Sequence, residues 1–371
     1  MINEVVNLEP LFYNALAVSF FSDYKKLARF KEKYRSWKAA WDAEGLPGSD
    51  PEKEFALVEK AGIKLILEDD PDFPALLKEI PLSPRALYFR GSLPEKNSVS
   101  LSVVGTRKAT PEGEECAYEL SRTLAANDIN IVSGLALGID AAAHKGALKT
   151  GRTFAVLATG ADNPYPHLNK RLAEEIIASG GALISEYPTG SMPMPYRFLE
   201  RNRIVSGLSR AVVLIEAPER SGSLATARFA LEQNREIFVV PGPRAHKNYR
   251  GSHALIREGA RLVTSGEEIL ADLGLSEKKS APLSPHAGSE EENAILEILR
   301  TRGPLSIDEI IEAVKLDTSL AVGIVSSLAI AGKLIEKPNG YQLIKGPDAP
   351  FRGGRGPDRS VGKKPNGYQI I

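Results

Sequence analysis

The sequence predicts an α/β protein built around a parallel β-sheet. Six apolar runs of four to six residues, rich in Val, Ile and Ala, lie between Ser98 and Gly266, and a glycine-containing loop follows each run. Each of these loops leads into a helix-like stretch. Short apolar runs that alternate with helical segments are typical of parallel strands joined by crossover helices. Such sheets collect the loops from their carboxyl ends at one edge, where folds of this kind bind ligands.

The composition is that of an ordinary soluble protein, with 43% hydrophobic and 25% charged residues in 371 positions. This length suffices for two or three domains. No apolar run approaches the roughly 20 residues of a membrane-spanning helix, and no basic stretch marks a signal peptide. Cys116 is the only cysteine, which excludes internal disulfides and cysteine-cluster zinc sites. We therefore expect a cytoplasmic protein without membrane association.

The N-terminal segment, residues 1–64, is predicted to be a small helical domain. Its stretches LFYNALAVSFF, DYKKLARFKEKYRSWKAAW and PEKEFALVEKAG carry apolar residues at helical spacing. The predicted core, residues 65–275, opens with IKLILEDDPDFPALLKEIPLSPRALYFRG, which indicates a short strand, proline-rich turns and a second strand ending at Gly91.

The C-terminal part is predicted to hold a linker, a winged-helix domain and a disordered tail. Residues 276–290 have linker composition. Residues 291–345 contain three helical stretches and then KLIEKPNGYQLI, a hairpin with a Pro-Asn-Gly turn. Residues 346–371 lack the apolar content of a folded segment. KPNGYQLI at Lys337 returns as KPNGYQII at Lys364, which we interpret as a duplication in the tail rather than a second hairpin arm.

The loop after the first predicted core strand reads VVGTRKAT and contains Gly105, Thr106, Arg107 and Lys108. A glycine turn at the start of a helix exposes backbone N–H groups to an anion, and Arg107 adds a planar donor fork for phosphate. The loop has neither the G-x-G-x-x-G nor the G-x-x-x-x-G-K-[ST] pattern, so we expect no dinucleotide site and no P-loop. The alternative is a tight turn with a solvated Arg-Lys pair.

A second candidate anion site is SGSLATARFALE, in which Ser221, Gly222 and Ser223 open a helix shortly after Glu216. Hydroxyls and free N–H groups at a helix start favour negative charge. The alternative is that the serines only cap the helix. The sequence is not G-x-S-x-G, which excludes a nucleophile elbow.

Three further loops supply weaker candidates. GADNPYPHLNKRLAEE combines Tyr165 with Asn169 and Lys170, an aromatic that can stack a base beside groups that hold phosphate; a simple turn before a solvated helix is the alternative. SGLALGID supplies Ser133, Gly134 and Gly138, with Asp140 expected to cap the following helix. RNRI supplies Arg201, Asn202 and Arg203, for which buried ion pairing is an equal alternative.

The motifs VVGTRKAT, IVSGLALGIDAAAH, G-x-x-x-x-YP, SEYP, RNRI, SGSLATA and VPG, in this order, resemble those of the DNA-processing protein A family (DprA, also called Smf). The resemblance covers about residues 65–273. It implies an extended Rossmann-like core that forms homodimers, binds single-stranded DNA and loads a RecA-type recombinase during natural transformation. It also implies that Arg107, Lys170 and Tyr165 contact the strand.

The resemblance thus completes the predicted site. The expected DNA-binding residues are Gly105, Thr106, Arg107, Lys108, Ser133, Gly134, Gly138, Tyr165, Asn169, Lys170, Arg201, Asn202, Arg203, Ser221, Gly222 and Ser223. The five histidines show no metal-ligand spacing. We expect no metal, no cofactor and no catalytic residues.

Two departures and one alternative accompany this resemblance. The N-terminal helices lack the G-x-G-P hairpin of many members. The third helix of the C-terminal domain, residues 319–332, has no basic residue, although a helix that reads the major groove normally presents Arg, Lys, Asn or Gln. We therefore interpret this domain as a protein-contact or structural module. The alternative function is a nucleotide phosphoribohydrolase on a related fold, whose P-G-G-x-G-T-x-x-E motif is missing here.

Overall fold

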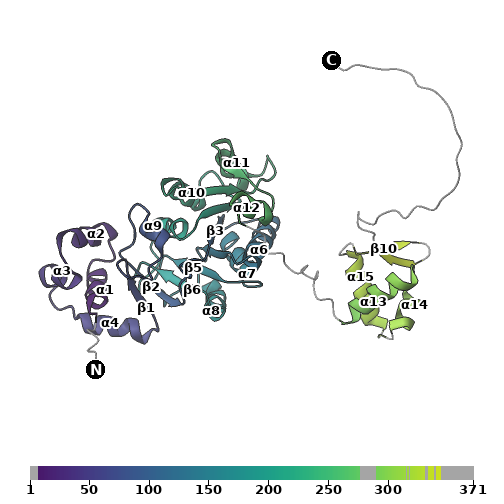
Figure 1. The fold of residues 1–371 in the computed structure, drawn as a ribbon, viewed down its shortest axis with the longest axis horizontal. Helices are drawn as coiled ribbons and strands as arrows, with labels where there is room; N and C mark the ends of the chain where they lie inside the picture. Colours follow the sequence, from purple (N-terminus) through teal and green to yellow (C-terminus); the bar gives the residue numbers. More distant parts are fainter. Residues whose placement is uncertain are drawn as a thin grey trace, which may run out of the picture. The chain divides into compact units, whose positions relative to one another are not determined.

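A computed structural model describes residues 7–275, 290–314, 316, 318–330, 333–337 and 340–343. The chain divides into two compact units, Met1–Ser280 and Ala281–Ile371, which are described separately (Figure 1). The predicted linker up to residue 289, the central residues of the predicted hairpin turn and the predicted tail lie outside the described residues.

The first unit is built on a nine-stranded sheet in the order β1-β2-β6-β5-β4-β3-β7-β8-β9. β1 pairs with β2 and β2 with β6 in antiparallel fashion, and the other neighbours pair in parallel. The strands are β1 Lys64–Leu67, β2 Ala86–Gly91, β3 Ser100–Gly105, β4 Asn130–Ser133, β5 Thr153–Leu157, β6 Ala182–Ser185, β7 Ala211–Ile215, β8 Glu236–Val239 and β9 Arg261–Leu262. The predicted mostly parallel sheet is confirmed. Sequence reasoning missed β9, because its two residues are exposed and form no apolar run.

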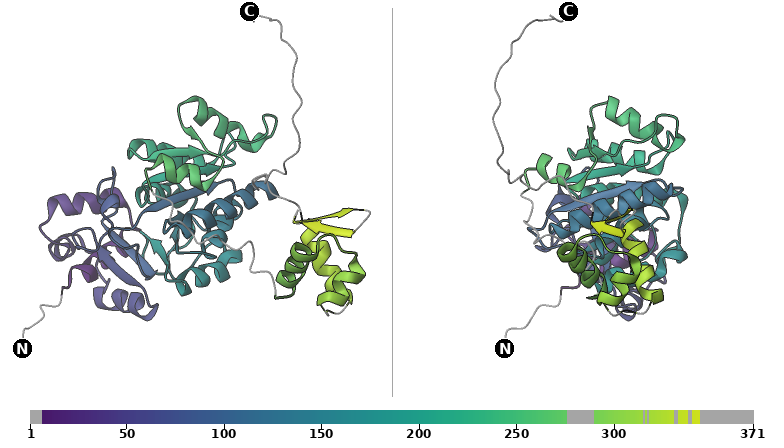
Figure 2. Two further views of the ribbon diagram at one scale, coloured as in Figure 1. Left: turned by 45° about the vertical axis from the view of Figure 1, so that its right-hand side comes forward. Right: turned by 90° about the vertical axis from the view of Figure 1, so that its right-hand side faces the viewer.

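Helices cover both faces of this sheet (Figures 1 and 2). One face packs against α6 (Pro111–Ala126), α7 (Ile139–Ala147) and α12 (Gly266–Asp272). The other packs against α5 (Ala75–Lys78), α9 (Pro195–Gly207), α10 (Gly222–Glu232) and α11 (Arg250–Arg257). Within β3, Leu101 and Val103 belong to the first layer and Val104 to the second. Burial on both faces explains why the parallel strands read as continuous apolar runs.

The N-terminal helices pack at the antiparallel edge of the sheet. They are α1 (Glu9–Ser19), α2 (Tyr24–Lys33), α3 (Trp37–Glu44) and α4 (Pro51–Lys60). Tyr13 and Trp37 meet edge-on, with ring centroids 4.9 Å apart, and share a cluster with Tyr88 of β2. The stretch from residue 23 to 41, predicted as one helix, forms two. Ser36 ends the first run by capping α3, where its side chain accepts a hydrogen bond from Ala39 N.

The second unit contains α13 (Glu290–Arg302), α14 (Ile307–Val314), α15 (Thr318–Ile330) and an antiparallel pair, β10 (Leu334–Lys337) and β11 (Gly340–Leu343). Its own cluster of Ile295, Leu299, Ile310, Val325, Leu328 and Leu334 holds these elements together. The order of elements is the expected three helices followed by two strands. The assignment as a winged helix stays a prediction.

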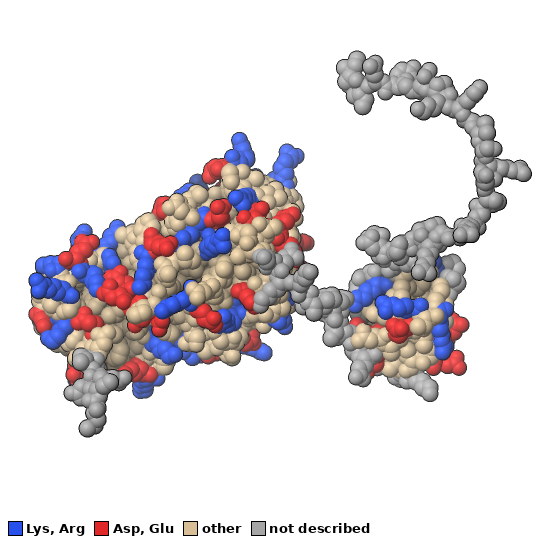
Figure 3. All heavy atoms as spheres, viewed as in Figure 1, with Lys and Arg blue, Asp and Glu red and all other residues tan. Residues whose placement is uncertain are grey.

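The strand order reverses at one place that matters for binding. From β3 to β6 the chain builds the sheet in one direction, and from β7 to β9 it builds in the other, so the reversal lies between β3 and β7. Open α/β sheets bind ligands at such a switch point, outside the carboxyl ends of the strands. Within the described parts of the chain, no helix is both long and apolar enough to cross a membrane. Lys and Arg side chains mix with Asp and Glu over the visible face of the first unit (Figure 3), so a positive site must be local.

Candidate anion-binding site at the carboxyl edge of the sheet

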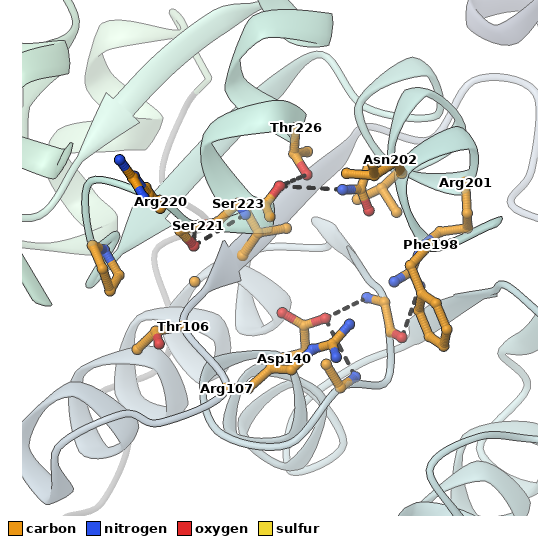
Figure 4. A pocket seen from close by; sticks show the side chains of 18 of the residues that line it. Thr106, Arg107, Asp140, Phe198, Arg201, Asn202, Arg220, Ser221, Ser223 and Thr226 are labelled. Carbon is orange, nitrogen blue, oxygen red and sulfur yellow. Dashed lines mark hydrogen bonds between the residues drawn. The ribbon is translucent and has the colours of Figure 1, made fainter. Parts of the chain in front are cut away.

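A pocket of about 550 Å³ opens at the switch point between β3 and β7. The loops after β3, β4 and β7 and one face of α9 form its walls (Figure 4). It is lined by nine of the predicted site residues: Gly105, Thr106, Arg107, Gly134, Arg201, Asn202, Ser221, Gly222 and Ser223. The fold therefore brings four separate predicted segments into one site: three loops and the RNRI stretch, which lies on α9.

The loop after β3 has a fixed backbone and a free cationic side chain. A side chain at Gly105 would place its Cβ 1.9 Å from the carbonyl oxygen of Ile215, so only glycine fits there. Thr106 N donates to the carbonyl oxygen of Glu216 over 2.8 Å. The Arg107 side chain is exposed, and its guanidinium carbon lies 5.1 Å from the centroid of the Phe198 ring. This cation–π contact orients Arg107 without consuming its hydrogen-bond donors.

A buried carboxylate, that of Glu216, ties this loop to the loop after β8. Glu216 accepts hydrogen bonds from Thr110 N over 3.0 Å, from Asn248 Nδ2 over 2.8 Å and from the Tyr249 hydroxyl over 3.2 Å, and also from the Thr110 hydroxyl. Burial raises the pKa of Glu216, but these hydrogen bonds outweigh it and hold the pKa below its usual range. No Lys or Arg of the described residues forms an ion pair with Glu216. The hydrogen bonds that this carboxylate accepts therefore hold the two loops together.

The start of α10 forms the opposite wall. Ser221 caps the helix by accepting from Ser223 N over 3.2 Å, and the two hydroxyls lie 2.6 Å apart. A Cβ at Gly222 would meet no atom within 4 Å, so the backbone there borders open space. Asn202 on α9 donates to the carbonyl oxygen of Gly222 over 3.2 Å. Capping and pocket lining are thus combined, and the positive end of the α10 dipole faces the pocket.

Arg201 and Arg203 of α9 were predicted to contact the strand, and the structure corrects part of this prediction because both are buried. Arg203 forms an ion pair with Glu186 at 2.5 and 2.7 Å and packs over the Tyr24 ring, with both charged side chains buried. It does not line the pocket, so we remove it from the strand-contacting set. Arg201 lines the pocket, but it donates to the carbonyl oxygens of Gly134 and Val156. Its role is to join the loop after β4 and strand β5 to α9.

Arg201 also adds positive charge to the pocket. Burial lowers its pKa to about 10; Asp140 opposes this effect and Arg107 adds to it. The side chain therefore stays charged at neutral pH. Among the described residues it forms no ion pair, but the Asp140 carboxylate in the same pocket lining offsets part of its charge.

Three other polar residues turn out to be structural. Ser133 is fully buried and donates to the carbonyl oxygen of Val103 over 2.7 Å. Asn169 is buried and donates to the carbonyl oxygen of Leu135 over 2.8 Å. The expected helix cap, Asp140, does not cap: its carboxylate accepts from the backbone N–H groups of Gly134, at 3.1 Å, and Ala136, at 3.3 Å. These groups shape the loop after β4 because each is engaged with its backbone or with a neighbouring strand.

Gly138 has a conformational role in the same loop. Its φ of 74° suits glycine, and a Cβ there would lie 2.6 Å from the carbonyl oxygen of Thr106. Gly138 thus permits the loops after β3 and β4 to approach each other.

The rim of the pocket carries two aromatic rings. Tyr165 is exposed, and its ring meets Phe198 edge-on with centroids 5.9 Å apart. Lys170 is exposed at the first position of α8 (Lys170–Ala178). Sequence reasoning missed Phe198. The available signal was its position three residues before Arg201, because residues three apart share a helix face.

The arrangement suits the binding of phosphates and bases. It offers exposed cations, a helix start and two aromatic rings, which together match phosphates and bases. Within the described ranges, no three His, Cys, Asp or Glu side chains are placed to hold a metal ion. His144 is buried on α7, and burial, with a smaller contribution from Arg201, lowers its pKa to about 3. It is neutral at physiological pH, and its Nδ1 lies 2.6 Å from the Thr153 hydroxyl.

Fold and site together define a Rossmann-like α/β protein with a candidate anion-binding pocket at the switch point of its sheet. Residues 64–274 match the family model for DNA recombination-mediator protein A. The chain is also 38% identical over 307 residues to Protein Smf of Escherichia coli K12, covering 81% of this chain and 82% of that protein. The chain belongs to the DNA recombination-mediator protein A (DprA/Smf) family, and the resemblance seen in the sequence is confirmed.

Further relatives carry the same name. The DNA processing protein DprA of Streptococcus pneumoniae R6 is 42% identical over 204 residues, covering 55% of this chain and 72% of that one. An X-ray structure of DprA from Streptococcus pneumoniae matches with a TM-score of 0.57 and 33% identity, covering 71% of this chain and 95% of the other. A structure of DNA processing protein A from Helicobacter pylori, which describes that protein's single-stranded DNA binding mode, matches with a TM-score of 0.51 and 29% identity, covering 57% and 97%.

Proposed function

We propose that this chain binds single-stranded DNA at the carboxyl edge of its sheet and acts as a recombination mediator, not as an enzyme. The observation that carries the proposal is the row Arg107, Phe198 and Tyr165. An exposed guanidinium lies over one aromatic ring, and a second ring touches the first at the rim of the pocket. Bases that are free of a duplex can stack on such rings while Arg107 holds a phosphate.

A single strand suits this site better than a duplex does. The aromatic rings can stack only on bases whose faces are exposed, which a duplex does not offer. On the face of the first unit drawn in Figure 3, acidic and basic side chains mix and form no continuous basic stripe. A broad duplex-binding surface would need a basic stripe. Family membership and the Helicobacter pylori relative support the same ligand.

The proposals on oligomeric state and on the role in recombination are supported by family membership. We infer that the chain forms a homodimer, protects incoming strands and loads a RecA-type recombinase during natural transformation. The family description as a recombination mediator supports this role. In this proposal residues 65–275 bind the strand, while the helices of residues 1–64 and the winged-helix domain of residues 291–345 are accessory. Strand-exchange assays with a RecA-type recombinase and light scattering of the purified protein test these parts.

The central experiment measures the affinity for a dT oligomer by fluorescence anisotropy over a salt series. Each phosphate contact contributes about 0.7 to the log–log salt slope of a single strand. Arg107→Ala should therefore flatten the slope by about 0.7. The ratio of the unmutated protein's affinity to that of the variant should then fall about 2.6-fold between 50 and 200 mM salt. Arg257→Ala is the matched control, because Arg257 is an exposed arginine at the far end of α11.

Two outcomes would contradict the proposal. If the unmutated protein does not bind the oligomer, or if Arg107→Ala binds like Arg257→Ala at every salt concentration, the pocket is not the strand site. If incubation with AMP yields free adenine and Ser223→Ala abolishes this turnover, the phosphoribohydrolase alternative replaces the binding role.

A further inference from the structure

We infer that a second groove beside the pocket is a phosphate subsite, so that the bound strand continues from the loop after β3 across the loops after β7 and β8. The inference rests on the proposed function and extends it. It assigns a role to basic residues of the loop after β8 that the predicted site does not include.

The groove has a volume of about 440 Å³ and adjoins the pocket directly, because Thr106, Pro218 and Arg220 line both. Its far wall is the 3-10 turn η2 (Lys247–Tyr249) together with the start of α11. Figure 4 shows Thr106, Arg220 and Ser221 on the same side of the pocket, and two of them, Thr106 and Arg220, also line the groove. A strand that leaves the pocket on this side meets the groove next.

The groove is lined by four exposed cations, Lys108, Arg220, Lys247 and Arg250. Glu219 is the single acidic residue in its lining. None of the four cations forms an ion pair within the described residues. Uncompensated cations grouped along a groove attract a chain of phosphates, and each contact releases counterions from the strand.

The backbone beneath these cations is held in place. Asn248 is buried, and its side chain donates to the carbonyl oxygen of Lys108 over 2.9 Å and to Glu216 over 2.8 Å. Gly251 N donates to the carbonyl oxygen of Ala217 over 2.8 Å. The loops after β3, β7 and β8 therefore form one connected block. Binding would order only the cationic side-chain ends, which lowers the entropic cost of association.

The sheet order sets the direction of the path. Neighbouring strands β5, β4, β3, β7 and β8 carry, in that order, Tyr165, Gly134, Arg107, Arg220 and Lys247 in the loops after their carboxyl ends. At about 4.8 Å between strands, the edge from β5 to β8 spans about 19 Å, which matches five or six nucleotides at roughly 3.4 Å per stacked nucleotide. Both aromatic rings lie toward the β5 end of this path, and the four cations of the groove lie toward its β8 end, so phosphate contacts continue beyond the bases that stack.

The test compares three proteins on a dT15 oligomer by fluorescence anisotropy from 50 to 200 mM salt. Lys247→Ala/Arg250→Ala should flatten the log–log slope by about 1.4, so that its deficit in affinity shrinks about sevenfold over this range. Lys149→Ala/Arg257→Ala is the control. It removes the same two charges from exposed positions just after α7 and at the end of α11, where crossover helices have run back to the amino edge. All three should have the same thermal midpoint.

The outcomes separate this inference from the proposed function. If the unmutated protein binds and Arg107→Ala flattens its slope, but Lys247→Ala/Arg250→Ala follows the control pair, the groove is not a subsite although the pocket is. If binding itself is absent, the proposed function fails first. If titration gives two bound strands per chain, and one after Lys247→Ala/Arg250→Ala, the groove binds its own strand and the continuous path is overturned.

Discussion

Two groups of arginines meet at the same edge of the sheet and have opposite roles. Arg107 in the loop after β3 is exposed, and its guanidinium lies over the ring of Phe198. Arg201 and Arg203 on α9 are buried and engaged with carbonyl oxygens or with Glu186. All three have the same charge and all belong to motifs of the family. The comparison teaches that burial, not charge, decides which arginine is free for a ligand.

The physical reason lies in where each residue stands along the chain. Arg107 follows the end of β3, at a turn whose backbone is fixed by Gly105 and Glu216. Its side chain extends from this turn and is exposed. Arg203 lies in the middle of a helix covered by the sheet and the N-terminal helices, where a charge without a partner would be very costly. Glu186 at the end of β6 supplies that partner.

The largest effect expected from this contrast is on stability. Arg203→Ala leaves the Glu186 carboxylate buried without its partner, which typically costs about 3–5 kcal/mol. Urea unfolding of the variant should show a loss of this size, whereas Arg107→Ala should stay within about 0.5 kcal/mol of the unmutated protein. The double change Arg203→Met/Glu186→Gln removes both charges and should recover part of the loss. If Arg203→Ala is as stable as Arg107→Ala but binds DNA poorly, the division between the two groups is wrong.

Glu216 extends the comparison between the two groups of arginines. It is a buried charge that fixes the backbone of the loop carrying the exposed Arg107. Glu216→Gln replaces one accepting oxygen with an NH2 group, which cannot accept the hydrogen bonds that this oxygen receives. The change should lower the free energy of unfolding by about 1–3 kcal/mol. The pKa of Glu216 is held below its ordinary value of 4.5 in the folded protein, so its contribution is complete above that value and is lost as the pH falls below it. Urea unfolding at pH 7 and at pH 4 should show a smaller difference between variant and unmutated protein at pH 4. A constant difference would mean that the carboxylate charge does not hold the loops.

A substitution at Phe198 tests whether the exposed Arg107 and the aromatic rings beside it bind DNA. Phe198→Ala removes the ring beneath Arg107 and beside Tyr165, and stacking contributes about 1–3 kcal/mol per base. Affinity for a dT oligomer should fall accordingly while the salt slope keeps its value, since a ring releases no counterions. Phe198→Tyr is the control and should retain most of the affinity. A slope that flattens as much as in Arg107→Ala would show that Phe198 acts only by orienting the guanidinium.

The sheet and the loops at its edge were predictable, because apolar runs and glycine turns are local patterns. The fate of each polar side chain in those loops was not. Ser133, Asn169 and Asp140 look like binding or capping groups in the sequence, yet the structure engages them with backbone groups of neighbouring loops. Those partners come from other strands, so no local pattern reveals them. Phe198 was missed because it precedes a conspicuous arginine cluster, although its helical spacing from Arg201 points to the same face.

The smallest expected effect concerns the second unit. Its third helix, α15, carries no Lys or Arg between Thr318 and Ile330, so it offers no positive charge to phosphates. The four hydrophobic clusters of the first unit draw on residues up to Leu275, whereas the fifth is formed by residues of the second unit alone. A chain ending at Leu275 should therefore fold and bind a dT oligomer within about threefold of the full chain, less than 1 kcal/mol. Anisotropy on the two proteins at one salt concentration decides this. A loss beyond about 100-fold, roughly 2.7 kcal/mol, would place part of the strand site in the second unit.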